Sequence, residues 1–156
     1  MLRVVDAVSG DELTTWRELC AEYAQMPHIA GRWDTWAADI ANLPGPCVPP
    51  LGAMLLALLD ERPVACVAMA PLDPPRFAEL KRLYVRADAR GHGVGEALTR
   101  EVIRVAIAGG YGALRLDTAP ELLAAQALYR RLGFREIPRY RWYGEADSVC
   151  FESSLR

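Results

Sequence analysis

The hydrophobic residues of this chain follow two different periods, and the changes between them mark the expected elements. Apolar residues three and four positions apart are typical of a helix with one buried face, whereas alternation and short apolar runs are typical of strands. Over residues 94–108, the apolar residues Leu98, Val102 and Val105 recur at helical spacing until Gly109 stops the pattern. This segment is predicted to be a helix that packs on a core.

Short apolar or alternating runs predict the strands. AMLLALLD and PVACVAMAPL flank Glu61 and Arg62, so we expect them to form an antiparallel hairpin. Five further segments have the same character and are predicted to be strands, namely LRVVDAV, FAELKRLYV, ALRLD, YRWYG and SVCFESSL.

Start and stop signals predict three further helices. Ser9 and Glu12 form a capping-box pattern that opens a helix through about Tyr23. A short helix is expected within MPHIAGRWDTWAADIANL, before the loop signal PGPCVPP. The last expected helix is Pro120–Leu132, with a proline in its first turn and Gly133 directly after its end.

The strand, helix and strand between Leu80 and Leu116 have the length of a crossover connection. Two strands joined in this way lie parallel and are connected right-handedly. We therefore expect an α+β, or mixed α/β, fold in which helices flank a central, mostly antiparallel sheet. The length of the chain, 156 residues, and its 52% hydrophobic content suit a single domain over residues 1–156.

Composition excludes several classes of protein. The densest apolar run, LGAMLLALL, is less than half of the ~20 residues that span a bilayer, and the N-terminus has no signal-like block, so a cytoplasmic protein without a membrane partner is expected. The cysteines are scattered without a CxxC pair, at Cys20, Cys47, Cys66 and Cys150. We expect reduced, buried thiols and no metal site.

Charge is uneven along the chain although the net charge is only −2. Residues 76–104 carry seven basic and four acidic side chains, and 130–141 carry five arginines and one glutamate. A local basic surplus suits a small polyanionic ligand better than a nucleic acid, which would favour a broad cationic face.

The glycine-rich stretch RGHGVG lies in this basic segment, directly before the predicted helix. Amides at a helix N-terminus lack partners within the helix and favour anions. Because Gly91, Gly93 and Gly95 have no Cβ, a phosphate group could approach the backbone closely. The alternative is an ordinary flexible turn between a strand and a helix.

Two known phosphate-binding loops do not fit this stretch. A P-loop needs Gly-Lys-Ser/Thr, whereas Glu96 follows Gly95. A dinucleotide-binding fingerprint needs a third glycine where Glu96 or Leu98 stands. Both readings are rejected.

The pattern Arg90-x-x-Gly93-x-Gly95 at a helix start resembles the pyrophosphate-binding motif of the GNAT N-acetyltransferase superfamily. With AELKRLYV before it and ALRLDT and ALYRRLGFREI after it, the segment from Glu79 to Ile137 looks like a bacterial GNAT protein. The resemblance implies acetyl-CoA as cosubstrate. It also implies that one parallel strand pair splays apart to receive the pantetheine arm.

By this resemblance, backbone groups of Leu83, Tyr84 and Val85 would bond the pantetheine amides, although Leu83 and Val85 could equally be plain core residues. The pyrophosphate would be held by Arg90, Gly91, His92, Gly93, Val94, Gly95 and Glu96. His92 is expected to contribute its backbone N–H while its ring faces solvent. Leu122 stands where relatives often have an asparagine that touches the cofactor, which puts one polar contact in doubt.

Tyr129 stands where many family members carry a tyrosine near the thioester sulfur, and a phenol there can give a proton to the departing thiolate. The alternative is a core tyrosine, because Ala125 and Leu132 share its helical face.

Glu79 lies where GNAT enzymes often take a general base, which would remove a proton from the attacking amine. Strand alternation predicts that it shares a face with Leu83 and Val85. Lys81 shares that face too, so the alternative role is a salt bridge.

The family resemblance also implies that the acceptor enters between the first helices and the loop joining the last two strands, which here are HIAGRWDTW and IPRYRWYGEAD. Trp33, Trp36, Tyr140 and Trp142 could line its pocket, and Arg32 or Arg139 could hold a carboxylate; the alternative is that they cover the core or face solvent. The acceptor class stays open between a small molecule and a peptide, and a homodimer stays open.

Two function classes remain. One is an acetyl-CoA-dependent N-acetyltransferase that lets a primary amine attack directly in a ternary complex. The other is a non-catalytic acyl-CoA binding or sensing module on the same fold. Covalent transfer through Cys66 or Cys150 is disfavoured, because neither has a histidine nearby in the sequence.

Overall fold

The computed structural model describes residues 1–32, 36–142 and 146–155, and within them a seven-stranded sheet has the order β1-β2-β3-β4-β5-β7-β6. The strands are β1 (Leu2–Asp6), β2 (Ala53–Leu59), β3 (Arg62–Pro71), β4 (Phe77–Val85), β5 (Ala113–Thr118), β6 (Arg135–Ile137) and β7 (Val149–Ser154). Among the described pairings, only β4 with β5 is parallel.

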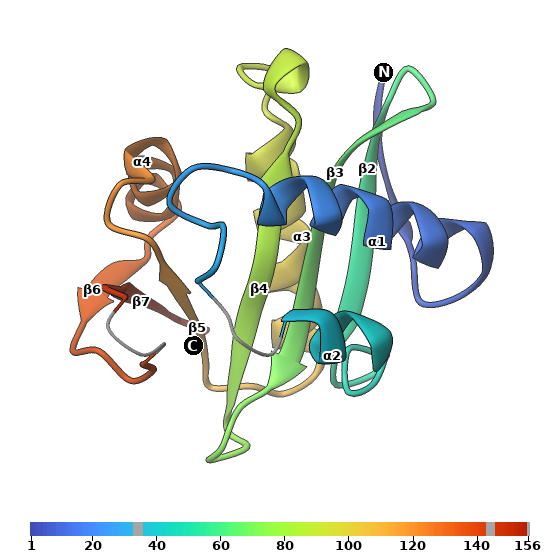
Figure 1. Cartoon of the computed structure of the whole chain (residues 1–156). Coiled ribbons are helices and arrows are strands. Elements are labelled where there is room, and N and C mark those ends of the chain that lie inside the picture. Colours follow the sequence, from blue (N-terminus) through green and yellow to red (C-terminus); the bar gives the residue numbers. More distant parts are fainter. Residues whose placement is uncertain (33–35, 143–145, 156) are drawn as a thin grey trace.

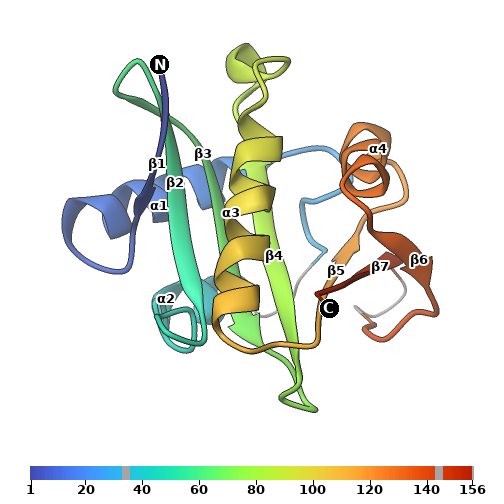
Figure 2. The same cartoon turned by 180° about the vertical axis from the view of Figure 1, so that it is seen from behind.

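Helices cover both faces of this sheet. They are α1 (Gly10–Ala24), α2 (Trp36–Ala41), α3 (Val94–Ala108) and α4 (Leu123–Arg131), with a 3₁₀ turn at Ala87–Ala89. In Figure 1, α1 and α2 lie in front of the central strands, and Figure 2 shows α3 across the opposite face. The predicted mixed α/β fold, with one mostly antiparallel sheet and one parallel pair, is confirmed.

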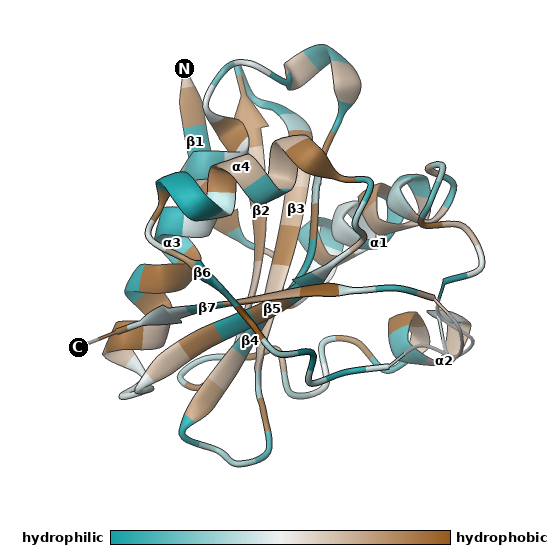
Figure 3. Cartoon of the chain, turned by 90° about the vertical axis from the view of Figure 1, so that its left-hand side faces the viewer, coloured by the Kyte–Doolittle hydropathy of each residue, from teal (hydrophilic) through white to brown (hydrophobic). Residues whose placement is uncertain are grey.

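The central strands consist largely of hydrophobic residues (Figure 3), and their side chains form a core on each face of the sheet. Under α3, Leu98 and Val102 are fully buried, as their helical spacing predicts. Under α1, Trp16 and Leu19 are buried, and the indole N–H of Trp16 donates a 3.0 Å hydrogen bond to the Val67 carbonyl. The two cores fix both helical layers against β3 and β4.

β4 and β5 pair over only part of their length. Their register joins Phe77 to Ala113 and ends where Glu79 meets Arg115. Beyond that point the rest of β4 stays paired with β3, whereas β5 pairs with β7. Figure 1 shows β5 leading away from β4 toward α4. The edge of residues 80–85 that faces β5 therefore has no strand beside it among the described elements.

The helix start predicted at Ser9 is confirmed, because Ser9 is the N-cap of α1, but the predicted capping bond and the predicted start of α4 were wrong. The Ser9 side chain makes no capping hydrogen bond, and a backbone bond from Leu13 N to Ser9 O closes the first turn of α1 instead. α4 begins at Leu123 rather than Pro120, because Leu122 N bonds to Ala119 O and closes a turn ahead of the helix.

The predicted strand YRWYG was also wrong for the part that the structure describes, since residues 140–142 are not in a strand. Successive strand residues point to opposite faces. Here the neighbours Tyr140 and Arg141 both bind Glu79, which a regular strand would not allow. The strand in this region is β6, a few residues earlier.

Candidate functional site

A cavity of about 570 Å³ opens where β4 and β5 diverge. Its walls are the end of β4, the RGHGVG loop of residues 90–95 (the glycine loop), α4 and the end of α1. Its lining includes Tyr23, Met26, Leu83, Tyr84, Val85, Arg90, Gly91, Gly93, Val94, Gly95, Glu96, Leu122, Ala125 and Leu128. The structure thus brings the predicted cofactor-binding residues together around one cavity, with the exception of His92.

The glycine loop owes its shape to left-handed backbone at Gly91 (φ 82°) and Gly93 (φ 74°). Residues with a Cβ rarely adopt this conformation. Apart from chain neighbours, no described atom lies within 4 Å of where a Cβ would stand on either glycine. Within the described part of the chain, no side chain caps the start of α3. The loop therefore presents the first amides of α3 to open space, which is the arrangement of an anion site.

Arg90 and His92 are tied to the loop itself. The Arg90 Nε donates to the Val85 carbonyl at 3.1 Å, which joins the loop to the end of β4. The His92 Nδ1 lies 3.1 Å from the Ala89 carbonyl and 3.2 Å from that of Arg90. The His92 ring is exposed, as predicted, but it is folded back on the loop.

Tyr129 lies on the inner face of α4, is 4% exposed, and packs against the rings of Phe134 and Phe151. It is not among the described residues that line the cavity. Burial, reinforced by Tyr23 and Asp117, holds the pKa of its phenol well above 10. The hydroxyl is therefore protonated at neutral pH, as a proton donor must be, while its packing is that of a core residue.

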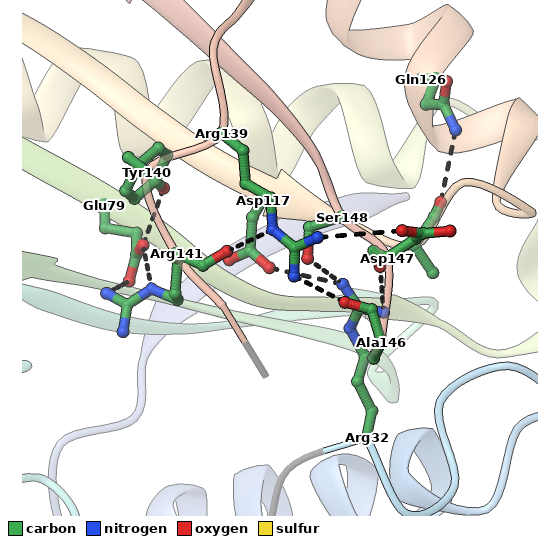
Figure 4. Close-up of polar contacts among 11 residues, drawn as sticks. Arg32, Glu79, Asp117, Gln126, Arg139, Tyr140, Arg141, Ala146, Asp147 and Ser148 are labelled. Carbon is green, nitrogen blue, oxygen red and sulfur yellow. Dashed lines mark hydrogen bonds and ion pairs between the residues drawn. The ribbon is translucent and has the colours of Figure 1, made fainter. Parts of the chain in front are cut away.

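Glu79 is 2% exposed, and residues from the loop after β6 hold its carboxylate (Figure 4). The Tyr140 hydroxyl donates to Oε2 at 2.7 Å, and Arg141 donates to Oε1 at 2.8 Å and to Oε2 at 3.1 Å. The expected ion pair with Lys81 exists, but it is long at 3.9 Å. Sequence reasoning missed Arg141 because it lies 62 residues away along the chain and no periodic pattern connects it to Glu79.

The prediction that Glu79 shares a face with Leu83 and Val85 was wrong. Arg82 has a φ of 60°, and the register of β4 against β3 shifts between Lys81 and Tyr84. One extra residue in a strand reverses the alternation beyond it. Leu83 and Val85 therefore pack toward the core under α3, whereas Glu79 faces the α1 side.

Arg32 and Arg139, the candidates for binding an acceptor carboxylate, are engaged within the protein. Arg32 donates to the Asp147 carbonyl at 2.7 Å and to Ser148 Oγ at 2.5 Å. Arg139 donates to two backbone carbonyls of the loop between β6 and β7 (Figure 4). Both guanidinium groups thereby fasten this loop.

The aromatic candidates have different surroundings. Trp36 packs against Tyr23, and Tyr140 is bound to Glu79. Trp142 is 65% exposed. Trp33 lies outside the described residues.

The four cysteines are buried free thiols, as predicted, and burial raises the pKa of each. Within the described residues no group of three or more His, Cys, Asp or Glu side chains could hold a metal ion. In the same part of the chain, no helix has the length and apolar character needed to cross a membrane.

Comparison with known proteins identifies relatives at the level of sequence. The model of the acetyltransferase (GNAT) family matches residues 11–134. An uncharacterised N-acetyltransferase of Schizosaccharomyces pombe is 36% identical over 131 residues, which are 83% of this chain and 80% of that protein. The N-acetylaspartate synthetase of Danio rerio is 34% identical over 100 residues, 64% of this chain but only 36% of the relative.

A GNAT-family acetyltransferase of Staphylococcus aureus Mu50 has the same fold, with a TM-score of 0.84 over the whole of both chains at 18% identity. The family match and the names of the relatives support an acyltransferase enzyme. The chain belongs to the GNAT family of N-acetyltransferases.

Proposed function

We propose that this GNAT-family enzyme transfers the acetyl group of acetyl-CoA to a primary amine by direct attack in a ternary complex. The observation that carries the proposal is the cavity of about 570 Å³, because both segments expected to bind acetyl-CoA line it. These segments are residues 83–85 of β4 and the glycine loop before α3. A pocket for acetyl-CoA needs both at once, since the pantetheine arm and the pyrophosphate are covalently joined.

The described residues fit acetyl-CoA. Among the described strands none pairs with the edge of residues 83–85 that faces β5, so this edge offers backbone groups to the two pantetheine amides in the manner of strand addition, although its Val85 carbonyl also accepts a bond from Arg90. The open space above Gly91 and Gly93 leaves room for a phosphate group close to the amides of α3. Arg90 lines the same cavity and can add a charge-assisted bond to a phosphate oxygen.

In the proposed reaction the amine nitrogen forms a bond to the thioester carbon, and the carbon–sulfur bond breaks. The departing thiolate takes a proton from Tyr129, whose buried phenol is protonated at neutral pH. The amine loses a proton to Glu79 through Tyr140, because the Tyr140 hydroxyl already donates to Glu79 Oε2. Tyr140 receives the amine proton as it passes its own to the carboxylate.

A small-molecule acceptor is favoured over a peptide. The Danio rerio relative is named for a product that is an N-acetylated amino acid. The loop between β6 and β7 is also held close to β4 by Arg141 and Tyr140, which narrows the approach to Glu79.

Two measurements test the proposal. Isothermal titration with acetyl-CoA should show saturable binding, and a panel of primary amines should release free CoA thiol above the rate of hydrolysis. Absence of binding would overturn the proposed donor. Binding without turnover on any amine would support the acyl-CoA sensing module instead.

A further inference from the structure

The bulge in β4 places two cations side by side. In a regular strand Lys81 and Arg82 would point to opposite faces. Because Arg82 has a φ of 60° and the register shifts there, both side chains line the same cavity on the α1 side of the sheet. The backbone irregularity thus gathers positive charge that the sequence pattern would have separated.

This second cavity has a volume of about 220 Å³ and lies between α1, α2 and the sheet. Its walls include apolar side chains, Trp16, Ile40, Leu43 and Ala68, and both cations reach it from β4. It is separate from the larger cavity, although residues 83–85 of the same strand line that one. The volume suits a ligand of about the size of one amino acid.

The two cations have different partners. Arg82 lies 3.4 Å from Asp39 and stacks on the Trp36 ring at 4.6 Å. Lys81 is 33% exposed and lies 3.9 Å from Glu79 Oε1, an oxygen that already accepts a 2.8 Å bond from Arg141. The ammonium of Lys81 is therefore only weakly paired with Glu79, and it can form an ion pair with an anion in the cavity.

Two further observations indicate a specific role for Lys81. It is the only lysine in a chain whose other seventeen Lys or Arg residues are arginines. Cys47 also lines the cavity; burial raises the pKa of its thiol, the charges of Lys81 and Arg82 act to lower it, and that of Glu79 acts to raise it, so both cations act on groups inside the cavity.

We propose that this cavity binds the carboxylate of the acceptor, so that the enzyme acetylates amines that carry a carboxylate, such as amino acids, rather than simple amines. The inference rests on the proposed acetyl transfer and names its substrate class. Lys81 Nζ forms the ion pair with the carboxylate. Because Lys81 lies 3.9 Å from Glu79, a carboxylate on Lys81 puts an amino group two or three bonds away near the proposed base. Asp39 and Glu79 beside the cations favour one carboxylate over a dianionic phosphate.

Matched acceptors test this directly. L-alanine and ethylamine, L-histidine and histamine, and L-ornithine and putrescine each differ by one carboxylate. We expect kcat/KM to be about 10- to 100-fold higher for the amino acid of at least one pair. Lys81→Gln should remove this preference by raising KM for the amino acid about 10- to 100-fold more than KM for the matched amine. Lys81→Arg should keep most of it.

The matched control is Arg104→Gln, which removes an exposed cation from α3. It should leave the preference intact. Equal kcat/KM within every pair, or a preference that survives Lys81→Gln, would overturn the inference.

A second readout does not depend on turnover. Reductive ¹³C-methylation labels Lys81 and the N-terminal amine alone, and Lys81→Arg identifies the lysine resonance. With CoA present, that resonance should shift saturably with the amino acids and not with the matched amines. If it does so while no amine is acetylated, the proposed acetyl transfer fails and the carboxylate site stands. If amines are acetylated without preference and the resonance does not move, the carboxylate site is overturned and acetyl transfer stands. If there is neither acetylation nor a shift of the resonance, both proposals are overturned.

Discussion

The hydroxyl of Tyr140 donates a 2.7 Å hydrogen bond to the buried carboxylate of Glu79, which lies 61 residues earlier in the chain. Glu79 is also the last residue of β4 that pairs with β5, opposite Arg115. The bond therefore fastens the loop after β6 at the point where the two parallel strands separate. It also joins a phenol directly to the proposed base.

If Tyr140 passes the amine proton to Glu79, Tyr140→Phe should lower kcat by about 100-fold. The loss of one hydrogen bond should cost about 1 kcal/mol of unfolding free energy. Steady-state kinetics and urea unfolding measure the two effects. Tyr111→Phe is the matched control, since it deletes the 2.7 Å bond to the Leu51 carbonyl elsewhere, and it should affect stability alone. A Tyr140→Phe enzyme with the kcat of wild type would contradict the relay.

Tyr129→Phe separates the acid from the core interpretation. Removing the phenol proton should lower kcat by about 100-fold while the dissociation constant for acetyl-CoA stays unchanged, because the proposed bond forms only to the departing thiolate. An acyl donor whose leaving thiol has a lower pKa should recover part of the rate. An unchanged kcat would leave Tyr129 as a core residue packed against Phe134 and Phe151.

Gly93→Glu should lower the affinity for acetyl-CoA by about 100-fold or more, since a carboxylate would occupy the space proposed for the pyrophosphate. The left-handed backbone adds roughly 1–2 kcal/mol of strain in the folded state. Gly110→Glu carries the same strain, at φ 84°, beyond the other end of α3. Titration calorimetry should show normal binding for Gly110→Glu; equal losses in both variants would refute the placement of the pyrophosphate.

The cysteines should be unreactive in the folded enzyme. Burial raises the pKa of Cys20 to about 12 and holds that of Cys66 well above 9, so few thiolates exist at neutral pH. At pH 8, Ellman's reagent should react with all four thiols only after unfolding. Cys66→Ala and Cys150→Ala should both retain kcat; loss of turnover in either, with CoA binding intact, would indicate covalent transfer.

Glu22 should make the stability of the fold depend on pH. Hydrogen bonds from Arg86 lower the pKa of this carboxyl below 4.5, its partial burial opposes them, and Tyr84 adds a weaker bond. A depressed pKa in the folded state means that the stabilisation is present above pH 4.5 and is lost as pH falls through the folded pKa.

Urea unfolding between pH 3 and pH 7 measures this effect. Glu22→Gln should be less stable than wild type at pH 7, and the difference should shrink below pH 4.5. Arg86→Met should give the same pH profile, and the double variant should be little worse than either single variant. A difference from wild type that is constant across the range would rule out Glu22 as the titrating group.

Local pattern sufficed for most of the elements. The helical spacing of Leu98 and Val102 predicted α3, and the apolar runs predicted β1 to β5 and β7, because burying one face of an element imposes its period on the sequence. The crossover length predicted the parallel pairing of β4 with β5. The spacing of Arg90, Gly93 and Gly95 indicated the family.

Tertiary structure alone decided which side chains meet at the centre of the molecule. The bulge at Arg82 is not visible in the pattern of apolar residues. It nevertheless reverses the alternation of β4, so that the side chains of Lys81 and Arg82 line the same cavity. The bonds from Tyr140 and Arg141 to Glu79 join residues about sixty positions apart. The period of the apolar residues indicates which face of a single element is buried, whereas these contacts depend on where separate elements come together. The sequence by itself therefore determined the fold and the glycine loop, and the packing decided the surroundings of Glu79.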